Sequence, residues 1–390
     1  MAESAPTQVR PDTAEKRGLP RALTYAGAII AFLIGSGFAT GQEILQYFTS
    51  YGYWGIFGTG LLVLVLMTYV CVELLTTGQR KQFARPSQIF HFYCGKHLGI
   101  FFDAFSILFV FLSFTVMVAG AGAVFQEHYG LSKYLGGIGL AVAVGITVWF
   151  GLRSLVDVIG RIGPLIVVIA VGLGLLGLVR GTGVVGGHHL LPTLELTQAS
   201  TNWFLAGLSY VGFCMLWLAA FLTALGKTAR TRREAASGGL LGGAVFSLAC
   251  IVVGLGLLAN ITRVNGTEIP MLVLAADLSP LLASGFSVII LAGIYTTAVP
   301  LLWTVSSRVF AEKTVPFKSL TLGLAAAGTV IGLVLPFSQM VNIVYVVNGY
   351  VGILLLALML VSTGRRAFRN RSADASPEVQ SRRSADRVAS

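Results

Sequence analysis

The sequence predicts an all-α integral membrane protein. Hydrophobic residues make up 55% of its 390 positions and charged residues only 11%, whereas a soluble domain carries about a quarter charged residues. The mean hydropathy is +0.81. Apolar stretches long enough to cross a bilayer, which takes about 20 helical residues, recur along the chain. Most of the length lies in such stretches, so we expect one membrane domain rather than a series of soluble ones.

Ten apolar spans are expected, an even number that places both termini on the same side of the membrane. The spans cover residues 21–50, 54–79, 99–127, 134–152, 154–179, 200–226, 236–261, 279–310, 317–335 and 339–363. The third and the eighth are longer than a bilayer requires, so we expect them to tilt or to extend beyond it. Residues 1–20 and 364–390 are polar and are expected to be disordered tails flanking a transmembrane domain at 21–363.

The net charge of +11 reflects membrane topology. The 27 Lys and Arg residues gather in alternate connecting segments and in the two tails, with Lys133, Arg180 and Arg263 as exceptions. This alternation is the positive-inside bias, which places both termini in the cytoplasm. It argues against a nucleic-acid surface. We expect the protein to lie in the cell inner membrane. The arginines after Gly364 are expected to rest on anionic lipid headgroups.

No residue pattern typical of an enzyme occurs in the sequence. The motifs HExxH, GxSxG and GxxxxGK[ST] are absent. The four cysteines show no ligand spacing and are expected to pack as small apolar residues. The pair His188-His189 has no further ligands near it in the sequence, which makes it a weak metal signal. We therefore expect neither enzymatic activity nor a cofactor, apart from a candidate sodium ion.

Span one is the stretch around which the other spans are organised. Its middle reads Gly35-Ser36-Gly37 and is followed by Thr40-Gly41-Gln42-Glu43. Two glycines around a serine lower helix propensity by about 1 kcal/mol each relative to alanine. Non-helical backbone at membrane depth is tolerated only where it faces protein or a watery cavity. The sequence therefore predicts a helix that is broken here and lines a binding site.

Span six repeats this pattern at Gly207-Leu208-Ser209-Tyr210-Val211-Gly212-Phe213. Spans one and six each begin a set of five, and an odd number of spans makes the two halves enter the membrane from opposite sides. Matched interruptions in two inverted halves indicate a transporter site. The alternative is that these glycines allow close helix packing, as in small-xxx-small contacts.

Three motifs carry a resemblance to the amino acid–polyamine–organocation superfamily with the LeuT-type fold. They are GAIIAFLIGSGF in span one, GLSYVGF in span six and IYTTAVP in span eight. The run GSGFATGQEILQYFTSYG further resembles a bacterial branch of membrane proteins without an assigned substrate. The resemblance covers roughly residues 21–363. It implies a five-plus-five inverted repeat, broken helices 1 and 6, and alternating access driven by sodium or protons.

The broken-helix hypothesis places a substrate carboxylate against the freed N–H groups of spans one and six. Phe213, the last residue of the span-six motif, resembles the aromatic residue that flanks the substrate in relatives. The candidate substrate-binding residues are Gly35, Ser36, Gly37, Ser209, Tyr210, Gly212 and Phe213.

Thr296 and Thr297 in span eight match the hydroxyl pair of a sodium site shared by many superfamily members. The resemblance adds carbonyls of Ala31, Ile34 and Gly293, and hard cations prefer such oxygen ligands. The alternative is that both threonines donate back to carbonyls one turn earlier in their own helix.

Two carboxylates lie deep in spans, where an acid is a functional candidate by default. Glu73 resembles the span-two glutamate that holds the unwound part of span six in sodium-coupled relatives, a structural role; the alternative is a proton relay. Glu43 lies about two turns beyond the break. It is a candidate for pairing with a substrate amine, for carrying a coupled proton, or for facing water at an external gate.

Weaker candidates complete the set. Phe111 and Phe114 are candidates for a gating ring, and Asn342 and Asn348 for hydrogen bonds between helices. Asp103 and Asp157 lie near Arg153 and Arg161 in the sequence, so they suit either an inner gate or plain interfacial charges.

The sequence thus predicts an ion-coupled secondary transporter of a small polar solute, an amino acid or related zwitterion. One alternative is a membrane sensor that binds a small ligand on the same fold without transporting it. The other is a channel or lipid mover, which a continuous polar stripe would favour; the polar residues instead cluster at the breaks.

Overall fold

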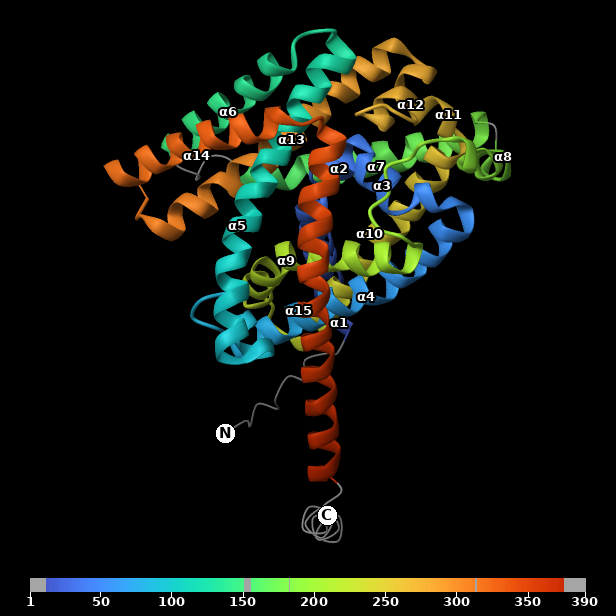
Figure 1. Ribbon diagram of the computed structural model, residues 1–390. Helices are drawn as coiled ribbons and strands as arrows, with labels where there is room; N and C mark the ends of the chain where they lie inside the picture. The colour runs from blue at the N-terminus through green and yellow to red at the C-terminus, as the bar shows by residue number, and fades with distance from the viewer. Residues whose placement is uncertain (1–11, 151–155, 182, 313, 375–390) are drawn as a thin grey trace, which may run out of the picture.

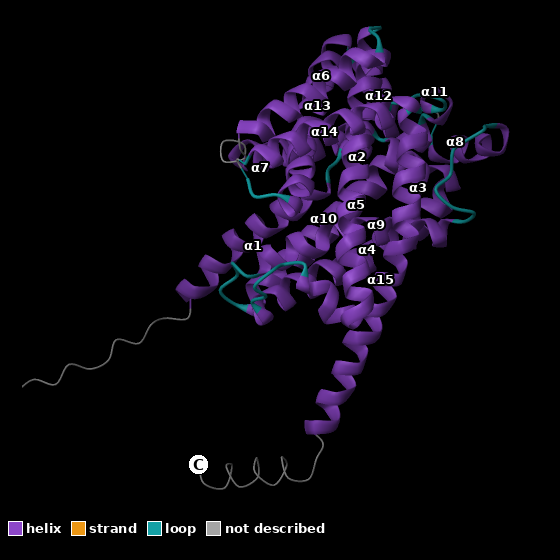
Figure 2. Cartoon of the chain, turned by 60° about the vertical axis from the view of Figure 1, so that its left-hand side comes forward, coloured by secondary structure: helices purple, strands orange, loops and turns teal. Residues whose placement is uncertain are grey.

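The structure is a computed structural model that describes residues 12–150, 156–181, 183–312 and 314–374. Helices joined by short connections make up this part of the chain, and it contains no strand (Figure 2). The start of α1 and the end of α15 lie at the same end of the molecule, whereas α8, α11 and α12 lie at the opposite end (Figure 1).

Helices occupy every range in which the sequence predicts a span. In the first half they are α1 Asp12–Leu33, α2 Ser36–Thr40, α3 Gln42–Tyr47, the 3-10 turn η1 Thr49–Tyr51, α4 Gly52–Lys81, α5 Gln88–Tyr129, α6 Lys133–Phe150 and α7 Val156–Arg180. In the second half they are α8 Val184–Leu190, α9 Trp203–Gly226, α10 Arg232–Ala259, α11 Ile261–Val264, α12 Pro270–Leu278, α13 Pro280–Val309, α14 Val315–Val334 and α15 Phe337–Asp374. Among the described residues, 8 helices are long and apolar enough to cross a membrane, or up to 9 if the bent pair α7–α8 is one span.

The helices at both ends of the chain extend beyond the predicted transmembrane domain. Helix α1 begins at Asp12 and α15 continues to Asp374, so helix reaches into both ranges predicted as disordered tails. At the C-terminal end, contacts of Arg366 explain why α15 continues beyond the predicted span. Its guanidinium lies 3.7 Å from the ring centroid of Phe92 and donates to the Phe92 carbonyl oxygen at 3.0 Å. This cation–π contact holds the extended part of α15 against α5.

Basic segments far apart in sequence meet at one end of the molecule. Lys227, after α9, donates to the carbonyl oxygen of Phe83, which follows α4, at 2.7 Å. Arg308 at the end of α13 forms an ion pair with Asp103 in α5. Segments that alternate along the chain therefore share one face, as the positive-inside pattern predicts. The side chains of Asp157, Arg153 and Arg161 lie outside the described residues.

Glycines let the helix backbones around α4 approach closely. A Cβ atom on Gly78 of α4 would lie 2.3 Å from the carbonyl oxygen of Thr223 in α9. A Cβ on Gly243 of α10 would lie 2.8 Å from the Cα of Thr68. Small residues are typical of helix contacts in membranes because association there depends on close packing.

We predict that Gly78→Ala destabilises the protein by about 1–3 kcal/mol, because a backbone oxygen cannot move aside as a side chain can. Gly139→Ala in α6 is the matched control, since its Cβ would meet no atom within 4 Å. There alanine should be neutral or stabilising by up to about 1 kcal/mol. Thermal unfolding of both purified variants in the same detergent checks this. Equal melting temperatures would contradict the packing assignment.

Candidate functional site

The helix of span one is interrupted where the sequence predicts a break. Helix α1 ends at Leu33 and α2 begins at Ser36. The Gly35 N–H donates to the Leu33 carbonyl at 3.1 Å instead of to the carbonyl four residues earlier, so the regular ladder stops. Gly41 then adopts a left-handed conformation, φ +85°, which favours glycine and separates α2 from α3.

The predicted break in span six is wrong: α9 is a continuous helix from Trp203 to Gly226. Its glycines serve close packing, which was the alternative. A Cβ on Gly212 would lie 2.3 Å from the carbonyl oxygen of Gly349 in α15, and a Cβ on Gly207 would lie 2.9 Å from the Leu62 side chain in α4. Tyr210 and Gly212 therefore offer no freed amides, and the predicted carboxylate cradle lacks its span-six half.

Glu43 is buried beside the break in span one. Only 1% of the residue is exposed, so it does not face water at an external gate. Its Oε1 accepts a hydrogen bond from the Tyr210 hydroxyl of α9 at 2.6 Å. The break and Gly41 turn α3 so that a carboxyl group from span one reaches a phenol from span six, and this contact joins the two motifs.

Aromatic rings surround this hydrogen bond. The Tyr47 ring meets the Tyr210 ring edge-on, with centroids 5.3 Å apart. The Phe213 ring stacks on Tyr345 of α15 at 4.8 Å, and Trp217 meets Tyr345 edge-on at 5.5 Å. The side chains of these five residues are all buried. Phe213 therefore lies in the aromatic group next to the break.

Several buried polar atoms in this region make no hydrogen bond, although buried polar groups in native proteins nearly always have a partner. We call their residues the buried polar cluster: Ser36 (Oγ), Gln42 (Oε1), Glu43 (Oε2), Tyr47 (Oη), Ser209 (Oγ), Tyr345 (Oη) and Asn348 (Oδ1). The Tyr47 hydroxyl approaches Ser209 and the Tyr345 hydroxyl approaches Ser36, without hydrogen-bond geometry. Unsatisfied buried groups cost about 1–3 kcal/mol each, so a polar ligand is favoured in this cluster.

The candidate ion site is only partly assembled as predicted. The Thr297 hydroxyl donates to the Ile34 carbonyl at the break, 3.4 Å away, so α13 touches span one where the resemblance implies. The Thr296 hydroxyl instead donates to the Gly293 carbonyl in its own helix at 3.0 Å, which was the alternative. Ala31, one turn before Gly35, loses the regular donor to its carbonyl at the break. Among the described residues, no group of three His, Cys, Asp or Glu side chains is placed to hold a metal ion.

Glu73 does not hold span six. Its Oε1 accepts from Tyr93 in α5 at 2.8 Å and from Thr363 in α15 at 3.4 Å, besides Thr77 in its own helix. Glu73 thus joins α4, α5 and α15 near the end that carries the basic segments. These hydrogen bonds between helices are compatible with the structural role that the resemblance implies, but the partners differ because α9 has no unwound part to hold.

The structure also shows the contacts of the weaker candidates, two phenylalanines and two asparagines. Phe114 and Phe111 pack against Gly328 of α14, since a Cβ on Gly328 would lie 2.6 Å from Phe114 and 3.7 Å from Phe111. Their role in a gating ring stays a prediction. Asn342 donates to Gln46 Oε1 of α3 at 3.0 Å, an interhelical bond as predicted. Asn348 donates within its own helix, to the Val344 carbonyl.

Three residues of the buried polar cluster, Gln42, Tyr47 and Tyr345, are not among the site residues that the sequence predicts. Tyr47 follows Glu43 by four residues, which places both on one face of a helix, and Asn348 follows Tyr345 by three. These spacings are the signal that was available. Nothing in the sequence shows that α15 lies against the break.

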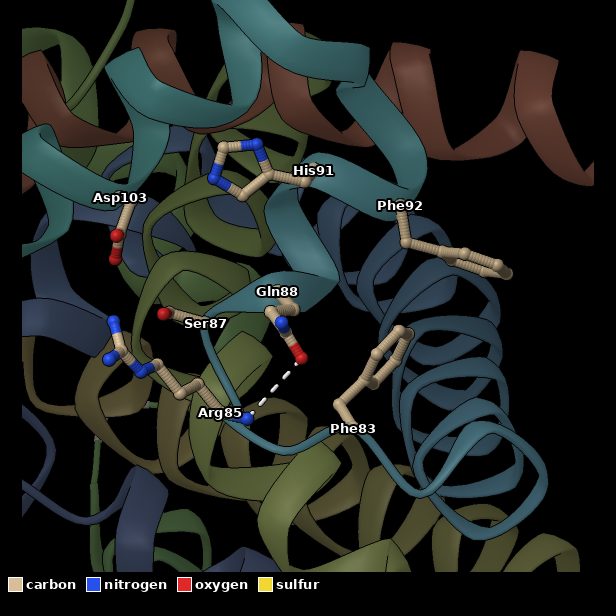
Figure 3. Close-up of a pocket in the computed structure, with 7 residues that line it drawn as sticks. All are labelled: Phe83, Arg85, Ser87, Gln88, His91, Phe92 and Asp103. Carbon is tan, nitrogen blue, oxygen red and sulfur yellow. Dashed lines mark hydrogen bonds between the residues drawn. The ribbon is translucent and has the colours of Figure 1, made fainter.

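An open hollow of about 560 Å³ lies elsewhere, at the connection between α4 and α5 (Figure 3). The Arg85 N–H donates to Gln88 Oε1 at 3.3 Å within it. Asp103, which lines the same hollow, is already paired with Arg308. None of the cluster residues lines it, so we do not assign it as the candidate site.

Comparison with known proteins places this geometry in a fold family. No protein-family model matches the sequence. The uncharacterized membrane protein YkvI of Bacillus subtilis (strain 168) is 24% identical over 359 residues, covering 90% of this chain and 96% of YkvI. The uncharacterized protein YyaD of the same organism is 25% identical over 342 residues, covering 85% of this chain and 94% of YyaD.

Two solved structures resemble the described helices. MhsT in complex with L-phenylalanine aligns with a TM-score of 0.63 at 15% identity, covering 86% of this chain and 88% of MhsT. The inward-facing conformation of Mhp1 aligns with a TM-score of 0.59 at 14% identity, covering 86% and 74%. These neighbours have the LeuT fold. The chain is therefore a multi-pass membrane protein of the LeuT-type fold, and the YkvI relative is likewise named a membrane protein.

We predict that Tyr210 and Glu43 are energetically coupled. A double-mutant cycle with Tyr210→Phe and Glu43→Leu should give a coupling energy of about 1–3 kcal/mol, because each single change leaves a buried group without its partner. Unfolding of the four proteins in one detergent measures it. Additivity within about 0.5 kcal/mol would show that the 2.6 Å contact contributes little.

Proposed function

We propose that the protein is an ion-coupled secondary transporter of a small polar solute bearing an ammonium group, a class that includes amino acids and related zwitterions. The observation that carries the proposal is the buried polar cluster beside a broken membrane helix. Half-helix ends and irregular backbone at membrane depth occur where they line a substrate site. The LeuT-type fold, which MhsT shares in its complex with L-phenylalanine, agrees with such a site.

The packing around the cluster supports alternating access. Towards the end that carries α12, Gln46 donates to the Ser338 carbonyl at 2.9 Å and accepts from Asn342. On the other side, Trp217 stacks on Phe109 with centroids 5.6 Å apart and donates to Ser113 Oγ at 3.1 Å. A solute enters or leaves the cluster only if one of these layers opens, so the two layers are suited to open in turn.

The membrane arrangement that goes with this function is the ten-helix, five-plus-five inverted repeat. Inversion fits the order of the helices, although of the two spans predicted to be broken, one and six, span one alone is interrupted. We place the shared end of α1 and α15 in the cytoplasm because the basic segments gather there, and we place the protein in the cell inner membrane.

Uptake into proteoliposomes tests the function directly. Purified protein is reconstituted in vesicles loaded with unlabelled amino acids and amines, and exchange of external labelled leucine, phenylalanine and their decarboxylated amines is followed. A transporter gives exchange above that of protein-free vesicles, and an imposed sodium or proton gradient drives accumulation. A sensor on the same fold binds the solute but gives no flux, and a channel gives flux that saturates weakly and never exceeds equilibrium.

We propose sodium as the coupled ion, held at Thr297 and the Ile34 carbonyl with Thr296, Gly293 and Ala31 nearby. Thr297→Val removes one hydroxyl oxygen from that set, so the sodium concentration that gives half-maximal uptake should rise by about tenfold or more, since a lost ligand costs at least about 1.4 kcal/mol. Thr304→Val, two turns further along the same helix, is the control and should leave it unchanged. Unaltered sodium dependence in Thr297→Val would contradict the site, and uptake driven by protons alone would contradict sodium.

A further inference from the structure

We infer that the site prefers organic cations, with the substrate's ammonium group bound to Oε2 of Glu43. The inference rests on the proposed function and narrows its substrate class. An amine should bind about tenfold or more tightly than the amino acid that carries the same side chain and an additional carboxylate.

The first support is the charge of the buried region. Among the described side chains, Glu43 and Glu234 are the only charged residues that are buried. Glu234 lies near the end of the molecule with the basic segments, where it faces Arg21 at 3.6 Å and accepts the Arg230 N–H at 3.0 Å. Glu43 has no basic partner in the described region. An ionised carboxylate at membrane depth is costly without a compensating positive charge, and a cationic ligand supplies one.

The second support is a surplus of acceptors. Glu43 Oε2, Gln42 Oε1 and Asn348 Oδ1 are all buried oxygen atoms that accept no hydrogen bond. The amide N–H of Asn348 is already used on its own helix, and the Tyr210 hydroxyl is used on Glu43 Oε1. An ammonium group has three donors and no acceptor, so it complements such a cluster.

The third support is the missing half of the predicted carboxylate cradle. Recognition of a substrate carboxylate needs hydrogen-bond donors or a basic side chain, and the buried polar cluster contains no basic side chain. Because α9 is unbroken, its amides are consumed in the helix and span six offers none. The hydroxyls of the buried polar cluster and the N-terminus of α2 remain as donors, so a substrate carboxylate finds only half of the predicted cradle. It would also lie near the Glu43 carboxylate and must lose the water around it.

The surroundings of Oε2 suit an organic group. A Cβ on Gly37 would lie 2.6 Å from Glu43 Oε2 and 3.2 Å from Cε2 of Tyr345. The free oxygen therefore faces α2 at a position without a side chain, next to an aromatic ring. Cations bound near aromatic rings gain about 0.5–2 kcal/mol, and the hydrocarbon part of an amine packs on the rings of Phe213 and Trp217.

Binding of matched probes to the full-length protein tests the inference. One set is phenethylamine, L-phenylalanine and 3-phenylpropionate; the other is isopentylamine, L-leucine and 4-methylpentanoate. Sodium chloride and potassium chloride are included as inorganic cations. Isothermal titration in lipid nanodiscs at pH 7 should show that each amine binds about tenfold or more tightly than its amino acid, and that neither acid binds.

Three variants test whether Glu43 is the residue that binds the ammonium group. Glu43→Gln should remove the preference for amines, and Gly37→Ala should weaken amine binding by about tenfold because the new methyl group displaces the carboxyl oxygen. Glu234→Gln is the matched control, a second buried carboxylate that should leave amine binding unchanged. The comparison of probes on the unmodified protein does not depend on whether any variant folds.

Tighter binding of the amino acids than of the amines would overturn the inference and leave the transporter proposal standing. Binding of sodium or potassium with no binding of either amine would also overturn it, as would no binding of any probe. Amine binding without flux in proteoliposomes would support the inference while contradicting transport.

Discussion

A carboxyl group buried at membrane depth is the constraint on which this structure depends. Hydrocarbon offers no partners for polar groups, so they must be satisfied inside the protein. The interruption at Ile34–Gly35 and the left-handed Gly41 turn α3 inward, which brings Glu43 within 2.6 Å of the Tyr210 hydroxyl. The rings of Tyr47, Phe213 and Tyr345 then exclude lipid and water from this contact.

Glycine has two distinct uses around this contact. At Gly41 it permits the left-handed backbone conformation that ends α2 and begins α3. At Gly212 and Gly349 it removes side chains so that the backbones of α9 and α15 touch. The site is consequently assembled from one broken helix and two continuous ones.

Polar and aromatic layers close the cluster on both sides, and their composition differs. The layer at Gln46, Ser338 and Asn342 consists of hydrogen bonds between the Gln46 side chain of α3 and the start of α15. The layer at Trp217 and Phe109 is a stacked aromatic contact. Hydrogen bonds can be exchanged with water at little net cost, whereas separating stacked rings exposes apolar area. Opening the first layer therefore replaces hydrogen bonds by bonds to water, whereas opening the second layer exposes apolar surface to water.

The sequence by itself determined the membrane class, the helical fold and the break in span one. Each apolar stretch must match the bilayer, and Gly35-Ser36-Gly37 within one of them conflicts with a regular helix. The positive-inside pattern likewise predicted which segments share one end. Only the tertiary structure decided whether the glycines of span six break the helix or pack it, because the same residue type permits both and the neighbouring helix selects. It also decided the partners of Glu43 and Glu73, which lie on helices distant in sequence and are set by packing.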